Sequence, residues 1–409
     1  MNLNLTRNLL ITLFSLLAIS LLSEVILRIF YTPLNSGWGW SDSPRRSLSN
    51  FENDFPNQLG VRGQQINYED GDFVILLLGD SQVEAATCSP DNMPEILLEK
   101  KMSVLFDNKV KVFSLAASGW GQDQQLLALK KYYNNFRVDI VIVWVTPKND
   151  FWENTFPDRS TSIKAGHLKP TFKFNEDNLI GPFLNPNVFY KNSALIQLFA
   201  SGYQELKGET IEQLILTKWM NELPAPHSSN FNDDNYNSKE NTEIDLNEFS
   251  ENIFNFSGKR NITILTHEDF INSRSHFSPY AISKSERDDY SINITKELFL
   301  KINDLTKSNE SKMLTLYPLR EDFDIVYNDC VKFVKSYCNR NQKISVTLDY
   351  LSLLREIIPE EQLINFMLNG KDEICVDKCD RHLNKKGIEQ VAEKLSNILK
   401  KKHLSALKN

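Results

Sequence analysis

Three short apolar runs stand out in the first half of the chain, at residues 73–78, 110–115 and 139–145. Each run ends at small or polar residues. The first run, FVILLL at 73–78, is unbroken, and a run of this kind is typical of a strand buried on both faces of a parallel sheet. Helical patterns near 90–104 and 122–135 lie between them. Strands that alternate with helices predict an α/β fold, here a three-layer α/β/α sandwich with a parallel sheet.

The second half of the chain continues this alternation less regularly. It contains predicted strands at 262–266 and 313–317, a helix near 286–307, and a closing helix for which Asn384 is a suitable N-cap. Before them lies a polar stretch rich in Asn, Ser and Asp, residues 225–246. Such a composition cannot bury enough apolar surface to order itself, so we predict a mobile loop there.

A longer apolar segment, residues 9–31, precedes the globular part. At helical rise it is long enough to cross a bilayer core of roughly 30 Å. Glu24 and Arg28 interrupt it four positions apart, on one helix face where they can pair. The segment is longer than the apolar core of a secretory signal and lacks a clear small-x-small cleavage site. These features favour an uncleaved transmembrane helix over a cleaved signal peptide.

These patterns divide the chain into three parts. Residues 1–31 are predicted to be a membrane anchor, and residues 32–70 a linker with a loop that leads into the first strand. Residues 71–409 form the α/β domain, with an insertion at about 151–250 that contains an apolar helical stretch at 193–223. Basic residues on the two sides of the span are nearly balanced, so the positive-inside rule alone barely fixes its orientation.

Composition narrows the function classes. The 409 residues carry a formal net charge of −7, which gives no basic footprint, so we expect no nucleic-acid partner. The five cysteines include two local pairs, Cys330 with Cys338 and Cys375 with Cys379, which suit either disulfides or buried thiols. Cys88 is left over and is expected to pack as a small apolar residue. A Cys-x-x-x-Cys pair is a poor zinc signal, and we predict no metal site and no cofactor.

Candidate chemistry lies at the ends of the apolar runs. The first run leads into Gly79-Asp80-Ser81, the second into the segment AASGWGQDQQ at 116–125, and the third into TPKNDF at 146–151. Near the end of the chain stands DRHLN at 380–384. Open α/β sheets bind ligands outside the carboxyl ends of their strands, where a serine can attack a carbonyl if a base accepts its proton. A lone Gly-Asp-Ser usually marks a turn, so the ordered set of four segments is what favours catalysis.

Ser, Gly, Asn and His at the ends of successive elements resemble the four blocks of the SGNH/GDSL hydrolase superfamily. The resemblance covers residues 73–155 and 372–400. The stretch NQLGVRG at 57–63 is also similar to the N-x-x-G-x-R-G sequence that precedes the first strand in membrane-anchored bacterial members. The resemblance implies the SGNH, flavodoxin-like form of the α/β/α sandwich.

The resemblance also implies roles for individual residues. Ser81 would be the nucleophile, and His382 would take its proton and later deliver it to the leaving group. The oxyanion would be held by the backbone N–H groups of Ser81 and Gly119 and by the side chain of Asn149. Loss of one such donor typically costs about 100- to 1000-fold in rate.

Two positions depart from the common pattern. The family usually has aspartate three residues before the histidine, where this chain has Cys379. Asp380 lies two residues before the histidine, a D-x-H spacing that resembles the alginate O-acetyltransferases, so we assign Asp380 as the orienting acid with Asp377 as the alternative. In the third block Pro147 replaces the usual glycine. Asn149 stays available, but the shape of the loop is open.

The resemblance implies a serine-dependent ester hydrolase or O-acyltransferase that works through a Ser-His-Asp triad. The anchor and the D-x-H spacing favour acylated surface carbohydrate as the substrate, outside the cytoplasmic membrane, with polysaccharide-assembly proteins as candidate partners. Water or a sugar hydroxyl can accept the acyl group, because both reactions use the same triad. A lipid esterase is the main alternative among enzymes. The alternative outside enzymes is a non-catalytic surface-glycan binding or assembly subunit, although such a protein has no need to retain all four residues.

Overall fold

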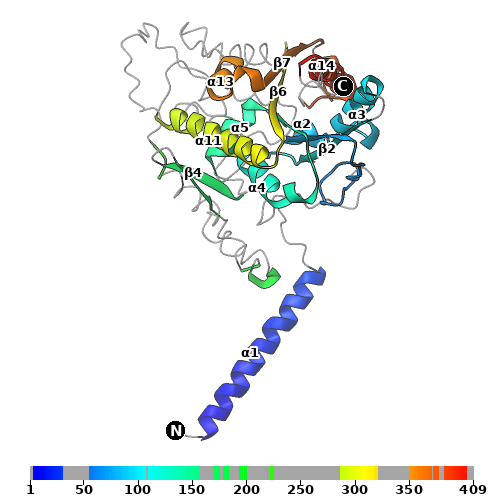
Figure 1. Cartoon of the computed structure of the whole chain (residues 1–409). Coiled ribbons are helices and arrows are strands. Elements are labelled where there is room, and N and C mark those ends of the chain that lie inside the picture. The colour runs from blue at the N-terminus through cyan, green and yellow to red at the C-terminus, as the bar shows by residue number, and fades with distance from the viewer. Residues whose placement is uncertain are drawn as a thin grey trace, which may run out of the picture.

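A computed structural model gives the architecture of the chain, which consists of a long N-terminal helix and an α/β domain (Figure 1). The structure describes residues 3–30, 55–106, 109–156, 169–175, 178–183, 193–196, 198–199, 219, 222–224, 286–320, 350–370, 372–376 and 382–402. The predicted strand at 262–266 and the predicted loop at 225–246 lie outside these residues.

A five-stranded sheet forms the centre of the domain, and each pair of neighbouring strands is parallel. Its strands stand in the order β2-β1-β3-β6-β7, so the order reverses on either side of β1. This is the doubly wound arrangement in which ligands bind beside the strand where the order reverses. The strands are β1 (Phe73–Gly79), β2 (Val110–Ala116), β3 (Ile140–Trp144), β6 (Lys312–Arg320) and β7 (Leu363–Leu368).

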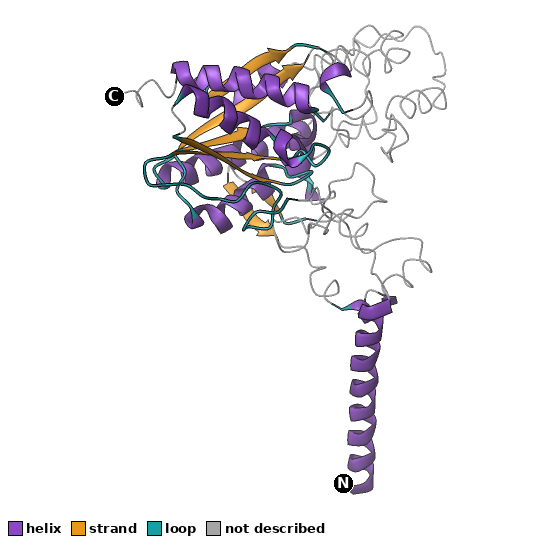
Figure 2. Ribbon diagram, turned by 90° about the vertical axis from the view of Figure 1, so that its right-hand side faces the viewer, coloured by secondary structure: helices purple, strands orange, loops and turns teal. Residues whose placement is uncertain are grey.

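Helices cover both faces of this sheet (Figure 2). One face is covered by α3 (Pro94–Leu105) and α14 (Lys385–Lys402). The other face is covered by α4 (Gln122–Tyr132), α5 (Pro147–Thr155), α11 (Glu286–Ser308) and α13 (Tyr350–Ile357). The predicted three-layer α/β/α architecture with a parallel sheet is therefore confirmed.

The apolar run of β1 supplies both hydrophobic cores. Val74, Leu76 and Leu78 point into the core beneath α4, α5 and α11, whereas Ile75 and Leu77 point into the core beneath α3 and α14. These five side chains are at most 1% exposed. A strand with two buried faces needs apolar residues at every position, which is why the run is unbroken rather than alternating.

Several elements differ from the sequence prediction. The helix expected near 90–104 begins at Pro94, after a 3₁₀ turn over Pro90–Asn92. Strand β7 and helix α13 were not predicted. A two-stranded antiparallel hairpin, β4 (Thr171–Asn175) and β5 (Asn178–Phe183), lies in the region that the sequence marked as an insertion. The division into anchor, linker and domain with an insertion stays a prediction.

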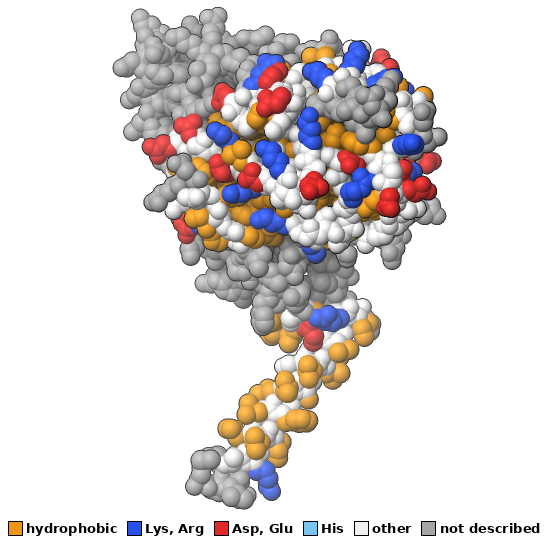
Figure 3. Space-filling model, viewed as in Figure 1, with side chains coloured by type: hydrophobic (Ala, Val, Ile, Leu, Met, Phe, Trp, Pro, Cys, Tyr) orange, Lys and Arg blue, Asp and Glu red, His pale blue; other side chains and the backbone are white. Residues whose placement is uncertain are grey.

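Helix α1 (Leu3–Phe30) extends away from the domain. Among the described residues, one helix is long and apolar enough to cross a membrane, over Thr6–Ile29, and none of its most apolar stretch is buried. Figure 3 shows its side chains as an almost continuous hydrophobic surface. The predicted pairing of Glu24 and Arg28 is confirmed, since Arg28 Nε donates to Glu24 Oε1 at 2.8 Å.

We predict that Gly79 at the end of β1 cannot be replaced by alanine without loss of stability. A Cβ at this position would lie 2.5 Å from Cγ2 of the fully buried Val83 and 3.3 Å from the carbonyl oxygen of Trp144. Overpacking of this kind costs about 1–3 kcal/mol, which chemical unfolding of the purified chain in detergent will measure.

Gly71→Ala is the matched control, because a Cβ at that exposed position meets no atom within 4 Å. In the double variant Gly79→Ala/Val83→Ala, the Val83 Cγ2 atom is absent, so overpacking should lower the free energy of unfolding very little. The smaller core is the remaining cost. Equal stability of the Gly79→Ala and Gly71→Ala variants would contradict the prediction.

Candidate active site

Three of the predicted site residues follow three adjacent strands at the same edge of the sheet. Ser81 follows β1, Gly119 follows β2 and Asn149 follows β3. The strands are in register up to this edge, with Gly79 opposite Ala116 and Leu78 opposite Val143. The site therefore lies at the carboxyl end of the strand where the sheet order reverses.

His382 reaches this edge from a segment far away in the sequence. Its Nε2 lies 2.7 Å from Ser81 Oγ, and both side chains are largely removed from solvent. This distance is that of a hydrogen bond between a nucleophile and its base. The two predicted members of the triad are thus in contact in the structure.

The segment that carries His382 is attached to the residues around Ser81. The backbone N–H of Leu383 donates to Gln82 Oε1 at 3.3 Å. The thiol of Cys88 donates to the carbonyl oxygen of Leu383 at 3.6 Å. Burial raises the pKa of the Cys88 thiol, which keeps its proton available for this contact. Cys88 therefore packs in the apolar core as predicted and also contacts the histidine segment.

The turn that carries Ser81 is a short helix, α2 (Ser81–Glu84), with well-defined ends. Asp80 is the N-cap, and its Oδ1 accepts the backbone N–H of Gln82 at 2.9 Å. At the other end Ala85 adopts a left-handed conformation with φ 45°. This conformation costs a residue with a Cβ about 1–2 kcal/mol, so the surroundings must compensate.

Arg62 holds this left-handed end of α2. Its guanidinium donates to the carbonyl oxygens of Glu84 (2.7 Å), Ala85 (2.9 Å) and Cys88 (2.6 Å). Helix ends leave carbonyl groups without intrahelical partners, and a planar guanidinium can bind several of them at once. Arg62 is 1% exposed. It therefore fixes the backbone that follows Ser81.

Glu84 connects α2 to the loop that contains Gly119. Its Oε2 accepts the backbone N–H of Ser118 at 2.8 Å and also accepts the Ser118 hydroxyl. Gly119 follows with φ +71°, a left-handed conformation that glycine adopts without strain. The sequence did not place Glu84 in the catalytic set. The structure shows it as a buried residue that positions the proposed oxyanion loop.

The third block forms the first turn of α5. Pro147 begins the helix, a position that proline favours because its fixed φ suits the first turn. The backbone N–H of Asn149 donates to the carbonyl oxygen of Thr146 at 2.8 Å, and Asn149 remains partly exposed. With Pro147 at its first position, the third block thus forms a helical turn at the sheet edge.

Three buried carboxyl groups, those of Asp80, Asp150 and Glu153, lie near Ser81. Burial, followed by the nearby carboxylates of Asp80 and Glu153, raises the pKa of Asp150 well above its ordinary value. Asp150 Oδ2 accepts the backbone N–H of Thr146 at 2.8 Å, which orders the turn before α5. Because Asp150 keeps its proton over a wider pH range, this region carries less negative charge than its three carboxyl groups suggest.

Some predicted residues cannot be placed in this geometry. Asp380 and its alternative Asp377 lie outside the described residues, as do Cys330, Cys338 and Cys379. The assignment of Asp380 as the orienting acid therefore stays a prediction.

Sequence reasoning missed the positions that support the site. Arg62 was noted only as part of a motif, and Gln82 received no role. The signal that could have found them is their type, because a charged or amide side chain next to a buried strand must find polar partners.

Comparisons with known proteins add little to this description. No protein-family model matches the chain, and no curated protein matches it. A similar solved structure is described as "The active site of a carbohydrate esterase displays divergent catalytic and non-catalytic binding functions". It is 10% identical, the superposition covers 83% of this chain and 68% of that chain, and the TM-score is 0.31. A TM-score this low gives no ground for assigning the activity of that protein to this chain.

We predict that Arg62→Lys lowers turnover of a small acetyl ester by about 10- to 100-fold with little change in KM. A lysine ammonium cannot bind three backbone carbonyls in one plane, so the nucleophile shifts, and misplacement by about 1 Å can cost about 100-fold.

Arg137→Lys is the matched control. Arg137 donates to Asp139 and to the carbonyl oxygen of Asp72 at the amino ends of the strands, remote from Ser81. The control variant should keep full turnover, and any effect should be a loss of stability alone. If both variants keep full turnover, Arg62 has no positioning role.

Proposed function

We propose that this chain is a serine-dependent ester hydrolase or O-acyltransferase of the SGNH/GDSL type. The observation that carries the proposal is the 2.7 Å contact between Ser81 Oγ and His382 Nε2 at the carboxyl edge of the sheet. The surrounding sequence blocks support it, because Gly119 and Asn149 follow the two strands that flank the nucleophile strand.

The proposed reaction begins when His382 accepts the hydroxyl proton of Ser81 as Oγ attacks the ester carbonyl carbon. The negative charge that develops on the carbonyl oxygen is stabilised by the N–H groups of Ser81 and Gly119 and by the side-chain amide of Asn149. The ester C–O bond then breaks, and His382 returns the proton to the leaving alcohol. Asp380 would keep the imidazole in the tautomer with Nε2 free to accept.

The acyl-enzyme is then resolved by a second hydroxyl. His382 takes a proton from water or from a sugar hydroxyl, whose oxygen attacks the acyl carbon. The bond between the acyl carbon and Ser81 Oγ then breaks, and His382 returns the proton to Oγ. Water gives hydrolysis, and a sugar hydroxyl gives O-acyl transfer. We propose acylated surface carbohydrate as the substrate, supported by the D-x-H spacing of Asp380 and His382 and by the N-terminal apolar helix.

We further propose that α1 is an uncleaved membrane anchor and that the domain lies outside the cytoplasm. Support for the anchor is the exposed apolar surface over Thr6–Ile29. A helix of this length reaches about 36 Å, enough for a bilayer core of roughly 30 Å. An anchored enzyme would meet its substrate at the membrane surface.

The Ser81→Ala variant tests the proposed chemistry. It should lower hydrolysis of a small acetyl ester by several orders of magnitude and abolish labelling by a serine-reactive fluorophosphonate, since the nucleophile is gone.

Ser89→Ala is the control, because Ser89 is exposed and only accepts a hydrogen bond from Asn92. It should keep both activity and labelling. A wild-type chain that neither hydrolyses the ester nor takes the label would favour a non-catalytic binding protein. A preference for long-chain over acetyl esters would favour a lipid esterase.

The orienting acid is tested by comparing Asp380→Asn with Asp377→Asn. The first change should reduce kcat about 10⁴-fold, as loss of the correct histidine tautomer does in related triads, and the second should cost far less. Equal or reversed costs would remove Asp380 from the triad while leaving Ser81 and His382 in place.

A further inference from the structure

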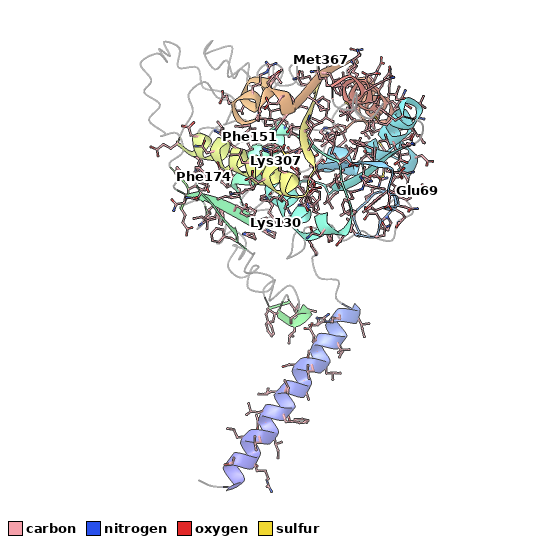
Figure 4. The ribbon with its side chains drawn as sticks, in the orientation of Figure 1. Glu69, Lys130, Phe151, Phe174, Lys307 and Met367 are labelled. Carbon is pink, nitrogen blue, oxygen red and sulfur yellow. The ribbon has the colours of Figure 1, made fainter. Side chains whose placement is uncertain are left out.

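The end of α1 is attached to a segment from the middle of the chain. Glu24 Oε1 accepts the backbone N–H of Ala194, and Oε2 accepts the backbone N–H of Leu195 and the hydroxyl of Ser193, each at 2.9 Å. Residues 193–199, of which all but 197 are described, lie beside the C-terminal end of α1 in Figures 1 and 4. We call these residues the latch segment.

The latch segment exposes apolar side chains next to an apolar helix. Ile196, Leu198 and Phe199 are 37%, 41% and 69% exposed. The sequence of the segment, SALIQLF, contains no charged residue. Single exposed apolar residues are ordinary on protein surfaces, but three within four positions form a patch that favours an apolar partner.

The position of the contact along the membrane-spanning part of α1 indicates that the apolar partner is the bilayer interface. Glu24 lies one and a half helical turns before Ile29, so its Cα is about 8 Å inside the end of the apolar span. Interfacial helices bury their apolar face about 5–10 Å into the boundary between headgroups and acyl chains. The latch segment is therefore fixed to α1 at the depth that an interfacial element occupies.

The polar contacts fit the same environment. A carboxylate at this depth is costly unless it finds partners, and so are the first N–H groups of a helical segment. The Glu24 carboxylate accepts hydrogen bonds from the N–H and hydroxyl groups of the latch segment, so both sides have partners. Arg28 is a further partner of the carboxylate. Hydrogen bonds of this kind contribute little to stability in water, where water can replace the partner, and much at an apolar boundary, where it cannot.

We propose that residues 193–199 are a second membrane contact, with Ile196, Leu198 and Phe199 inserted into the bilayer interface and Glu24 as the attachment to α1. This rests on the proposed membrane anchoring of α1. The latch segment lies between β5 and α11 in the sequence, so this contact would give the chain a second attachment to the bilayer besides α1 itself.

The test uses the full chain in vesicles of phosphatidylethanolamine and phosphatidylglycerol, with p-benzoyl-phenylalanine in place of Phe199. Illumination should give lipid adducts, detected by mass spectrometry, at least 10-fold more abundant than with the same photoprobe in place of Val104. Val104 is 84% exposed on α3 and is the matched control for an exposed apolar position away from the membrane. Lipid adducts at residue 199 no more abundant than at residue 104 overturn the proposal.

Glu24→Ala should reduce the lipid adducts at residue 199 at least 3-fold. Thr12→Ala should leave them unchanged, because the Thr12 hydroxyl bonds only to the Asn8 carbonyl within α1. Undiminished adducts in Glu24→Ala would overturn the role of Glu24 as the attachment.

Carbonate extraction separates this proposal from the anchor on which it rests. Release of the wild-type chain into the supernatant overturns the anchor and the second contact together. Retention in the membrane pellet without lipid adducts at residue 199 overturns the second contact alone.

Discussion

Strand β1 is the element on which the rest of the structure depends, because both of its faces are buried and both of its edges are paired. Its side chains alternate between two cores, and its backbone fixes the register of β2 and β3. The position of Ser81 is therefore determined by the whole domain. A displacement of Ser81 would require two cores and two strand pairs to move with it.

Around this rigid strand, the site is assembled by polar contacts to the backbone. Arg62 binds carbonyl groups after α2, Glu84 binds the N–H of Ser118, and Gln82 binds the N–H of Leu383. Each contact joins segments that are distant in sequence. Together they orient Ser81, the loop that contains Gly119 and the segment that carries His382 relative to one another, which is the arrangement that the proposed electrostatic stabilisation of an oxyanion would need.

The sequence predicted those parts of the fold that depend on local pattern. Buried parallel strands are mostly apolar, so β1, β2 and β3 could be located within a few residues even though Lys111 and Ser114 interrupt β2. Asn384 was found as an N-cap because its side chain type favours that position. Strand β7 was missed because it lies at the sheet edge, where the polar Asn365 interrupts its apolar run and Met367 is 39% exposed, unlike the residues of the central strands. Arg62 and Glu84 could not be given roles, since their partners are backbone groups that become neighbours only after the chain has folded.

The way in which Arg62 binds has a consequence for how this chain can change over evolutionary time. All three of its acceptors at the end of α2 are main-chain oxygens, which every amino acid possesses. A substitution at Ala85 or Cys88 therefore leaves both acceptors in place, and what limits change at these two buried positions is core packing and, at Ala85, the left-handed backbone. Position 62 does not share this tolerance, because no other side chain offers the same planar set of donors. Lineages whose side chains change around the end of α2 can retain its backbone geometry as long as that one arginine persists.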